Sequence, residues 1–313
     1  MIAFAALGLL GQYAVYRARR YRLTRTIYRG LRFHQAGSAI RYAIRASLWW
    51  IVTGVTLGLA YPFQVASLER YKMRNTFYGD LAGSFTGCGF RLFLRGLPMW
   101  VAVLAPLAVA AGAVIEVVDW DALGDTISLG GDDMLSRIEG ANPQLAGAAV
   151  FAMLMVGTSV TLAALLYPTF QALMLRWWSS GLRFGEIEMR STLRTAQVYG
   201  VYARFLGYAI LFSIAAAIAA IPALLVWYSL AGNEQAGTGG EILTTAMLLG
   251  SYVIAALGFS TVYRATVLLS LWQLGMESLQ LSGLTALDRV KASGASSSAV
   301  GEGLADALNT GGY

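Results

Sequence analysis

The chain has 313 residues, of which 57% are hydrophobic and 13% are charged, and this apolar excess excludes an ordinary soluble domain. The formal net charge is +6, but the arginines stand at the ends of apolar runs, which indicates membrane topology rather than nucleic-acid binding. Cys88 and His34 are the only residues of their types, which excludes an intramolecular disulfide, a thiol zinc site and a cluster of histidine ligands. We therefore expect no metal and no other cofactor.

Apolar stretches divide the chain into segments that are expected to enter a membrane. A bilayer core needs about 20 apolar residues per helix, so the last four stretches predict transmembrane helices, and the first predicts a short membrane segment. The expected fold is therefore an all-α polytopic membrane protein with about six hydrophobic segments. These are 1–16, 43–66, 97–118, 145–172, 205–230 and 242–263.

Charges between the last four segments predict an orientation. Segments 119–144 and 231–241 are acidic and are expected outside, whereas 67–96 and 173–204 are basic and are expected in the cytoplasm. The same alternation places the C-terminus in the cytoplasm.

The segment 43–66 does not fit a simple crossing. Nine arginines and no acidic residue lie within 17–45, so both flanks of the segment are basic. A single crossing would place one basic flank outside. A re-entrant hairpin, with Thr56-Leu57-Gly58 near the bend and Pro62 in its second arm, would keep both flanks inside, and the charges favour it.

The predicted domain organisation has two parts. Residues 1–279 form a repeat-containing transmembrane domain. Residues 280–313 are rich in Gly, Ser and Ala without a long apolar run, and they predict a flexible cytoplasmic tail.

Comparison of the chain with itself indicates an internal repeat. Residues 20–31 (RYRLTRTIYRGL) and 70–81 (RYKMRNTFYGDL) share Arg, Tyr, Thr, Tyr and Leu at a constant offset of 50. At an offset of 106, Tyr61, Pro62 and Gly79 align with Tyr167, Pro168 and Gly185. Each unit is expected to end an apolar helix at Tyr-Pro and to continue with an Arg-aromatic pair and a Gly-containing turn.

The stretch after the third Arg-aromatic pair has the alternation of a strand. In 182–190, Ile187 and Met189 fall on one side, and Glu186, Glu188 and Arg190 on the other. We therefore expect short β-ribbons on the cytoplasmic face, after the Arg-aromatic pairs.

The Arg-aromatic pairs are the candidate functional residues. Tyr and Trp favour the headgroup level of a bilayer, and Arg can extend past them to lipid phosphates. Topology determination alone is the simpler explanation of these arginines, but nine within 17–45 exceed what orientation needs. The residues expected to contact anionic headgroups or a partner are Arg20, Tyr21, Arg25, Arg29, Arg70, Tyr71, Arg74, Arg176 and Trp177.

Several of these motifs resemble the YjgN-like family of bacterial inner-membrane proteins. The resemblance covers most of 10–275 and implies a bacterial inner-membrane location without an assigned activity. Neighbouring genes in that family imply a membrane zinc metallopeptidase as a partner. The matching segments are TRTIYRGLRF at 24–33, TLGLAYPFQ at 56–64, ERYKMRNTFYGD at 69–80 and, more weakly, YPTFQ at 167–171.

These features favour a binding protein over an enzyme. The sequence has no P-loop, HExxH or GxSxG motif. The leading hypothesis is a lipid-facing inner-membrane platform that recruits or regulates a membrane partner such as a metallopeptidase. The alternative is a small-solute or lipid transporter or channel, favoured by the repeats but not by the scarcity of charge within the predicted spans. Close helix packing at Gly54 and Gly58 would also suit a homo-oligomer.

Overall fold

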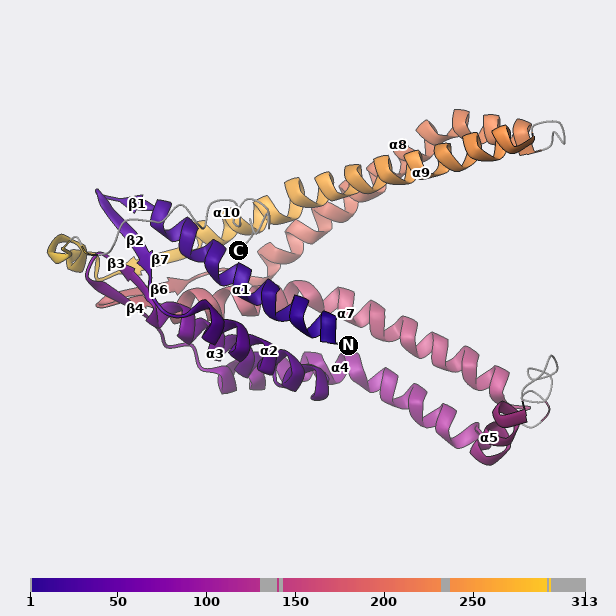
Figure 1. Ribbon diagram of the computed structural model, residues 1–313, viewed down its shortest axis with the longest axis horizontal. Helices are drawn as coiled ribbons and strands as arrows, with labels where there is room; N and C mark the ends of the chain where they lie inside the picture. The colour runs from indigo at the N-terminus through magenta and orange to yellow at the C-terminus, as the bar shows by residue number, and fades with distance from the viewer. Residues whose placement is uncertain (1, 130–139, 141–142, 232–236, 292, 294–313) are drawn as a thin grey trace. The chain divides into compact units, whose positions relative to one another are not determined.

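The computed structural model describes residues 2–129, 140, 143–231, 237–291 and 293 (Figure 1). The chain forms two compact units. Unit 1 comprises Met1–Phe170, Arg176–Arg190 and Gln280–Tyr313, and unit 2 comprises Gln171–Leu175 and Ser191–Leu279.

Within the described residues, four stretches of helix are long and apolar enough to cross a membrane, and each overlaps one of the four predicted transmembrane helices. Their large apolar side chains, such as Met153 at 77% and Leu211 at 63% exposed, are open to the surroundings. Exposed apolar surface costs about 25 cal/mol per Å² in water, so these helices indicate a membrane protein. The stretches are Gly89–Val117, Leu145–Gly181, Thr195–Pro222 and Thr245–Glu277.

These stretches lie in five helices and one π-helical turn. Between the first two stretches lies α5 (Trp120–Leu129). Unit 2 has a core of Ala172, Leu193, Val198, Val201, Val267 and Leu271. The helices are α4 (Gly89–Val117), α7 (Leu145–Gly181), α8 (Thr195–Ala231), α9 (Gly237–Tyr263), the π-helix η2 (Arg264–Leu268) and α10 (Leu269–Glu277).

The first helix is longer than the predicted membrane segment 1–16. Helix α1 (Ile2–Arg25) continues into the arginine-rich stretch, because neither Gly nor Pro interrupts residues 12–25. It is not among the four candidate membrane spans. Its buried residues Ala14, Tyr16 and Ala18 face the unit's interior, so α1 is a packing element of unit 1.

The segment 43–66 folds as two helices rather than one. Helix α2 (Ala39–Val55) is capped by Ser38, whose hydroxyl accepts a hydrogen bond from Arg41 N at 3.4 Å. The chain reverses at 56–60, where Leu57 has φ 49° and Gly58 has φ 89°. Helix α3 (Tyr61–Arg74) carries a proline in its first turn, where the missing N–H is tolerated. The predicted hairpin geometry is therefore observed, while its re-entry into a membrane stays a prediction.

A buried hydrogen bond joins the two arms of this hairpin. Thr53 Oγ1 of α2 donates to Gln64 Oε1 of α3 at 2.7 Å, and the two residues are 7% and 3% exposed. At the bend, Trp100 Nε1 of α4 donates to Leu57 O at 2.8 Å. The Thr53–Gln64 bond thus fixes the register of α3 against α2, and the Trp100 bond joins α4 to the bend.

Removal of the Thr53 hydroxyl is expected to destabilise the hairpin. Thr53→Val leaves the Gln64 oxygen buried without its donor, at a cost of about 1–3 kcal/mol in the free energy of unfolding. The double variant T53V/Q64L is expected to lose less than T53V, because neither arm then buries an unpaired polar group. Thermal unfolding in detergent would measure both. Thr158→Val, at an exposed threonine that bonds within its own helix, is the control, and equal losses in T53V and T53V/Q64L would contradict the expectation.

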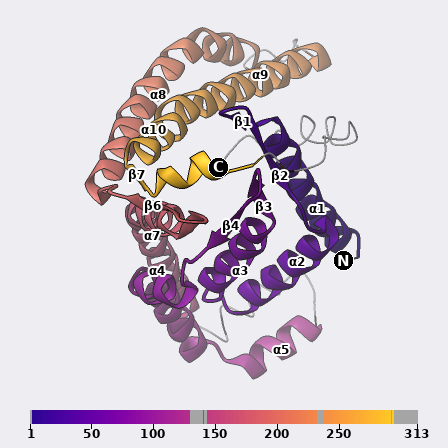
Figure 2. The same ribbon diagram turned by 90° about the vertical axis from the view of Figure 1, so that its left-hand side faces the viewer.

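The predicted β-ribbons are present, but they are not separate. Within the described ranges, the strands join in one seven-stranded sheet in the order β1 to β7, with antiparallel pairing from β1 through β6 (Figure 2). The fold is mostly helical, as expected, and the predicted short ribbons are parts of this sheet. A two-stranded ribbon leaves edge N–H and C=O groups unpaired, and pairing of β2 with β3 and of β4 with β5 satisfies them. The strands are β1 (Ile27–Tyr28), β2 (Leu31–Gln35), β3 (Thr76–Tyr78), β4 (Leu81–Phe85), β5 (Leu182–Phe184), β6 (Ile187–Ser191) and β7 (Leu279–Ser282).

Segments 20–31 and 70–81 adopt the same local structure. Thr26 and Thr76 each donate their hydroxyl to the carbonyl four residues earlier, at 3.0 and 2.7 Å. In each ribbon, the tyrosine before the turn pairs with the leucine after it. The origin of these segments by repetition stays a prediction.

The two Tyr-Pro pairs do not end helices, in contrast to the expectation. Tyr61-Pro62 begins α3, and Tyr167-Pro168 lies inside α7, which continues to Gly181. Gly79 and Gly185, the aligned glycines of the same two repeat units, do lie in turns as predicted. Their φ values at the turns between strands are 57° and 55°.

Part of the predicted C-terminal tail lies against the strands of unit 1. After β7 comes the short 3-10 helix η3 (Leu284–Arg289), and Asp288 pairs with Arg29 at 3.0 Å. Asp80 N donates to Lys291 O at 3.0 Å, and Lys291 N donates to Asp80 Oδ1 at 2.9 Å. Residues 294–313 lie outside the described part of the chain, so the flexibility of that tail and the boundary at 279 stay predictions.

Candidate functional site

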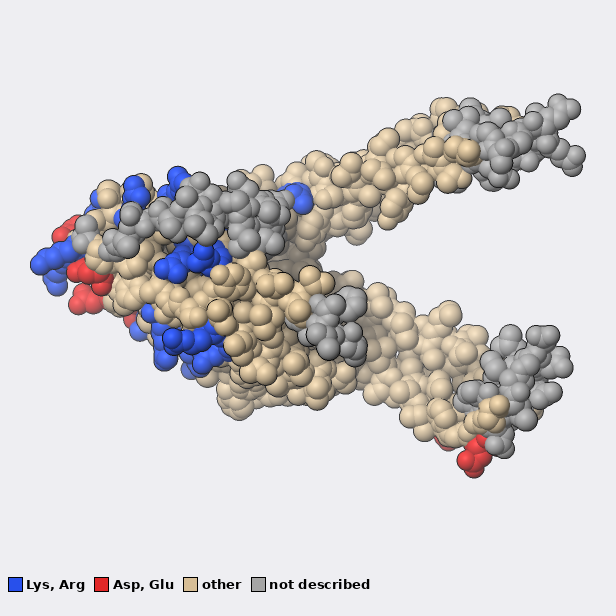
Figure 3. Space-filling model, viewed as in Figure 1, with Lys and Arg blue, Asp and Glu red and all other residues tan. Residues whose placement is uncertain are grey.

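Positive charge in unit 1 gathers over the strands and helices α1 to α3, whereas the outer parts of α4 and α7 show no basic side chains on the face in Figure 3. Three of the nine predicted headgroup residues lie together in this basic region, on α3: Arg70, Tyr71 and Arg74. They line an open pocket with two further residues, and this pocket is the candidate site.

The pocket forms where one face of α3 meets α2. Ser67, Arg70, Tyr71 and Arg74 follow the helical spacing of three and four residues, so they share one face of α3, and Arg45 comes from α2. The cavity measures ≈ 220 Å³. Three guanidinium groups thus line one small opening.

Contacts with the protein hold several of these side chains. Arg70 donates to Gly87 O at 3.2 Å, and the Arg45 guanidinium lies 5.5 Å from the centre of the Tyr71 ring. The Tyr71 hydroxyl donates to Ser38 O at 2.9 Å and accepts from Ser38 N at 3.2 Å. Within the described part of the chain, neither Arg45, Arg70 nor Arg74 forms an ion pair with a carboxylate. Among the residues that the structure describes, no carboxylate therefore compensates the positive charge of the pocket.

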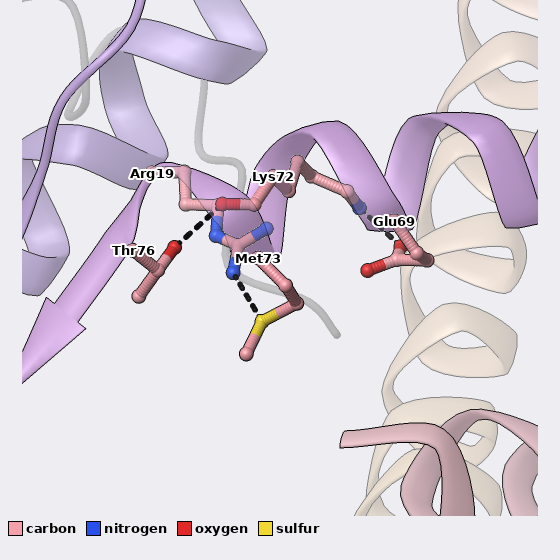
Figure 4. A network of polar contacts seen from close by, with 5 residues as sticks. All are labelled: Arg19, Glu69, Lys72, Met73 and Thr76. Carbon is pink, nitrogen blue, oxygen red and sulfur yellow. Dashed lines mark hydrogen bonds and ion pairs between the residues drawn. The ribbon is translucent and has the colours of Figure 1, made fainter. Parts of the chain in front are cut away.

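The acidic residue nearest in sequence, Glu69, points elsewhere. Glu69 is 8% exposed and pairs with Lys72 (Figure 4). At the spacing of an α-helix, Glu69 and Lys72 lie on the opposite side of α3 from Ser67, Arg70, Tyr71 and Arg74. On the same side, Arg19 of α1 donates to Met73 Sδ at 3.7 Å. Burial lowers the pKa of Arg19, and the charge of Glu69 opposes that shift. The Glu69 charge therefore balances basic groups inside unit 1 and not those of the pocket.

An apolar groove continues from the pocket along α2. The groove measures ≈ 640 Å³ and shares Arg45 and Tyr71 with the pocket. Along α2, its lining changes from arginine to hydrophobic residues. The lining comprises Arg41, Ile44, Arg45, Leu48, Trp49, Val52 and Tyr71.

Sequence reasoning missed the contribution of α2 to this site. It counted Arg41 and Arg45 among nine basic residues without assigning either to the site, and it did not single out Ser67. The signal was present in α2, since Arg41, Arg45, Leu48 and Val52 recur at helical spacing on one face.

The remaining predicted residues lie outside this pocket. Arg20 is exposed on α1, and the Arg25 guanidinium lies 5.3 Å from the centre of the Tyr21 ring. Arg29 lies at the turn between β1 and β2 and pairs with Asp288. On α7, Trp177 donates to Cys88 O at 3.1 Å and packs against Phe85, and Arg176 is half-buried beside it. Trp177 therefore serves packing in unit 1.

The single histidine and the single cysteine are not part of the pocket lining. His34 of β2 stacks on Phe77 of β3 with ring centres 5.0 Å apart. Burial and, to a smaller extent, the positive charge of Arg20 lower the pKa of His34. In the described ranges, no three His, Cys, Asp or Glu side chains come together as a metal site.

Comparison with known protein families gives a match over nearly the whole chain. A family model described as "Bacterial protein of unknown function (DUF898)" matches residues 1–307, which includes the region that resembles YjgN-like proteins. No curated protein matches the chain, and no solved structure matches it.

Proposed function

We propose, since this chain belongs to the DUF898 family of bacterial proteins of unknown function, that it is an inner-membrane protein whose α2–α3 pocket binds an anionic lipid headgroup. The observation that carries the proposal is the convergence of Arg45, Arg70 and Arg74 on one pocket that opens into an apolar groove. An anionic lipid is complementary to this arrangement, because its negative headgroup fits the arginines and its hydrocarbon chain fits the apolar groove. The role proposed is binding rather than catalysis.

The charge of the pocket and the exposed apolar tip of the α2–α3 hairpin support lipid binding at the membrane surface. Basic residues near an anionic membrane surface contribute about 1 kcal/mol each to binding. The pocket arginines are exposed, and so are apolar residues at the tip of the hairpin, Val55 at the end of α2 at 80% and Leu57 in the bend at 71%. A hairpin whose tip enters the bilayer would bring the pocket to headgroup level on the cytoplasmic side.

Arg70→Gln with Arg74→Gln is expected to weaken anionic-lipid binding by about 30-fold or more, at least about 2 kcal/mol, because both substitutions remove charge-assisted hydrogen bonds to the headgroup phosphate. The measurement is the affinity of the purified protein for phosphatidylglycerol-containing nanodiscs, with native mass spectrometry of the lipids that remain bound. Unchanged affinity would contradict the proposal.

The control variant removes the same charge at the same spacing elsewhere. Arg91 and Arg95 are exposed arginines four residues apart in the first part of α4, outside the pocket. R91Q/R95Q is expected to lose clearly less binding than R70Q/R74Q, because Arg91 and Arg95 contribute general surface charge but do not line the pocket. An equal loss in both double variants would mean that total charge, and not the pocket, attracts the lipid.

On this proposal, the lipid-bound face is a platform for a membrane partner, such as the zinc metallopeptidase implied by the family resemblance, or a second copy of the chain. Affinity purification in mild detergent should recover such a partner with the wild-type protein and less of it with R70Q/R74Q. Lipid or solute movement by the isolated protein in liposomes would instead favour the transporter alternative.

A further inference from the structure

We infer that the lipid held between α2 and α3 is a phosphomonoester lipid, with its terminal phosphate in the arginine pocket and one hydrocarbon chain in the groove along α2. This inference rests on the proposed function and names the class of lipid. It follows from the charge of the pocket, from the polarity of the groove and from the geometry of the hairpin.

The charge of the pocket fits a dianion. Its lining has three guanidinium groups and no carboxylate. A phosphomonoester has a second pKa near 6, so it carries between about −1.5 and −2 at pH 7, whereas a phosphodiester carries −1. A phosphomonoester is therefore the better match to three arginines in a lining without a carboxylate.

The donors of the pocket also suit a terminal phosphate. A phosphomonoester presents three oxygens that accept strong hydrogen bonds, and arginine binds such oxygens through paired N–H groups. Arg70 and Arg74 come from one helix and Arg45 from the next, so donors approach from two elements. Ser67 adds a hydroxyl from the same face of α3. A diester headgroup would offer fewer charged oxygens to the same donors.

The groove has the polarity that such a lipid requires. It runs along α2 from Arg41 to Val52, which at the rise of an α-helix is about 16 Å. Arg41, Arg45 and Tyr71 lie toward the pocket, and the further end is apolar. The apolar residues are open to a ligand, with Ile44 47%, Leu48 59% and Val52 44% exposed. A hydrocarbon chain attached to a phosphate in the pocket would cover these side chains.

The hairpin explains why the hydrocarbon chain of a lipid can lie along α2. The chain reverses at 56–60, and α3 packs against a different side of α2 through Thr53 and Gln64. Of the residues of α3, Tyr71 borders the groove, so most of the apolar stripe of α2 stays uncovered by α3. Uncovered apolar surface of this kind is stabilised by contact with hydrocarbon. The phosphate and the hydrocarbon chain of the lipid would thus bind to adjacent parts of α2.

The test compares lipids of matched chains with the intact purified protein in mild detergent, by native mass spectrometry and by tryptophan fluorescence. Phosphatidic acid is expected to bind about tenfold more tightly than phosphatidylglycerol at pH 7.5, and the difference should shrink at pH 5, where the monoester carries one charge. Arg45→Gln should remove most of the difference, whereas Arg91→Gln should not. Equal affinity for the two lipids would overturn the headgroup inference and leave the proposed function intact. Binding of neither lipid would overturn both.

Two further experiments test where the hydrocarbon chain binds and whether the bound phosphate belongs to a lipid. Leu48→Ser should weaken long-chain phosphatidic acid about fivefold and leave dihexanoyl phosphatidic acid unchanged. No effect on the long-chain lipid would overturn the placement of the chain in the groove. Inorganic phosphate at the same concentration should not displace phosphatidic acid. Displacement would mean that the pocket takes a soluble phosphate and not a lipid.

Discussion

Tyr16→Ala is expected to lower the free energy of unfolding of unit 1 by about 3–5 kcal/mol, the usual cost of truncating a large buried aromatic side chain. Tyr16 is 1% exposed, and its ring lies 4.9 Å from that of Tyr42 and 5.8 Å from that of Tyr71. Its hydroxyl donates to Ala36 O at 2.7 Å. One side chain thus joins α1 to both arms of the hairpin, so its loss would open a cavity where three helices meet.

The measurement is thermal or denaturant unfolding in detergent, followed by near-UV circular dichroism. Tyr16→Phe should cost about 1 kcal/mol, because it removes only the hydrogen bond to Ala36. Tyr13→Ala, at a half-buried tyrosine on the same helix, should cost clearly less than Y16A. Because Tyr71 lines the pocket and packs on Tyr16, Y16A should also weaken lipid binding. Equal losses in Y13A and Y16A would contradict the role given to this cluster.

Alkaline pH is expected to destabilise unit 1 through Tyr42. Burial raises the pKa of Tyr42 to about 12, and the negative charge of Glu69 adds to the shift. The neutral phenol is therefore favoured in the folded state. Its contribution to stability is fully present below pH 10, the pKa of an unfolded tyrosine, and is lost as pH rises toward 12. Two pKa units correspond to about 2–3 kcal/mol.

Unfolding of the wild type and of Tyr42→Phe between pH 9 and 12 would measure this contribution. The phenylalanine variant should lose less stability over that range, because its ring does not titrate. Some loss is expected to remain, since burial also raises the pKa of Tyr16. Parallel stability curves for the two proteins would exclude Tyr42 as the source.

The same residues connect stability with the proposed lipid site. Tyr71 packs in the aromatic cluster through its ring, bonds to Ser38 through its hydroxyl and lines both the pocket and the groove. The orientation of the pocket arginines thus depends on the packing of α1 against the hairpin. Variants should therefore be compared for binding only after their unfolding temperatures have been measured.

Local patterns predicted some parts of the site and not others. The pair Arg70-Tyr71 stood out in the sequence because both residues recur at Arg20-Tyr21, yet only the copy on α3 lines the pocket. The copy on α1 faces different neighbours, because Tyr21 stacks with Arg25 of its own helix. Arg45 lies 25 residues before Arg70 in the chain, so no local motif links the two.

By itself, the sequence determined the four membrane-length helices, the turn at 56–60 and the strands that follow α1, α3 and α7. Each of these depends on neighbouring residues: the length of an apolar run, a glycine at a bend, or alternation along a strand. Only the tertiary structure decided that the ribbons form one sheet and that Arg45 meets Arg70 and Arg74. The reason is that sheet order and helix register are set by contacts between distant residues, such as Phe33 with Tyr78, Thr53 with Gln64, and Tyr16 with Tyr71.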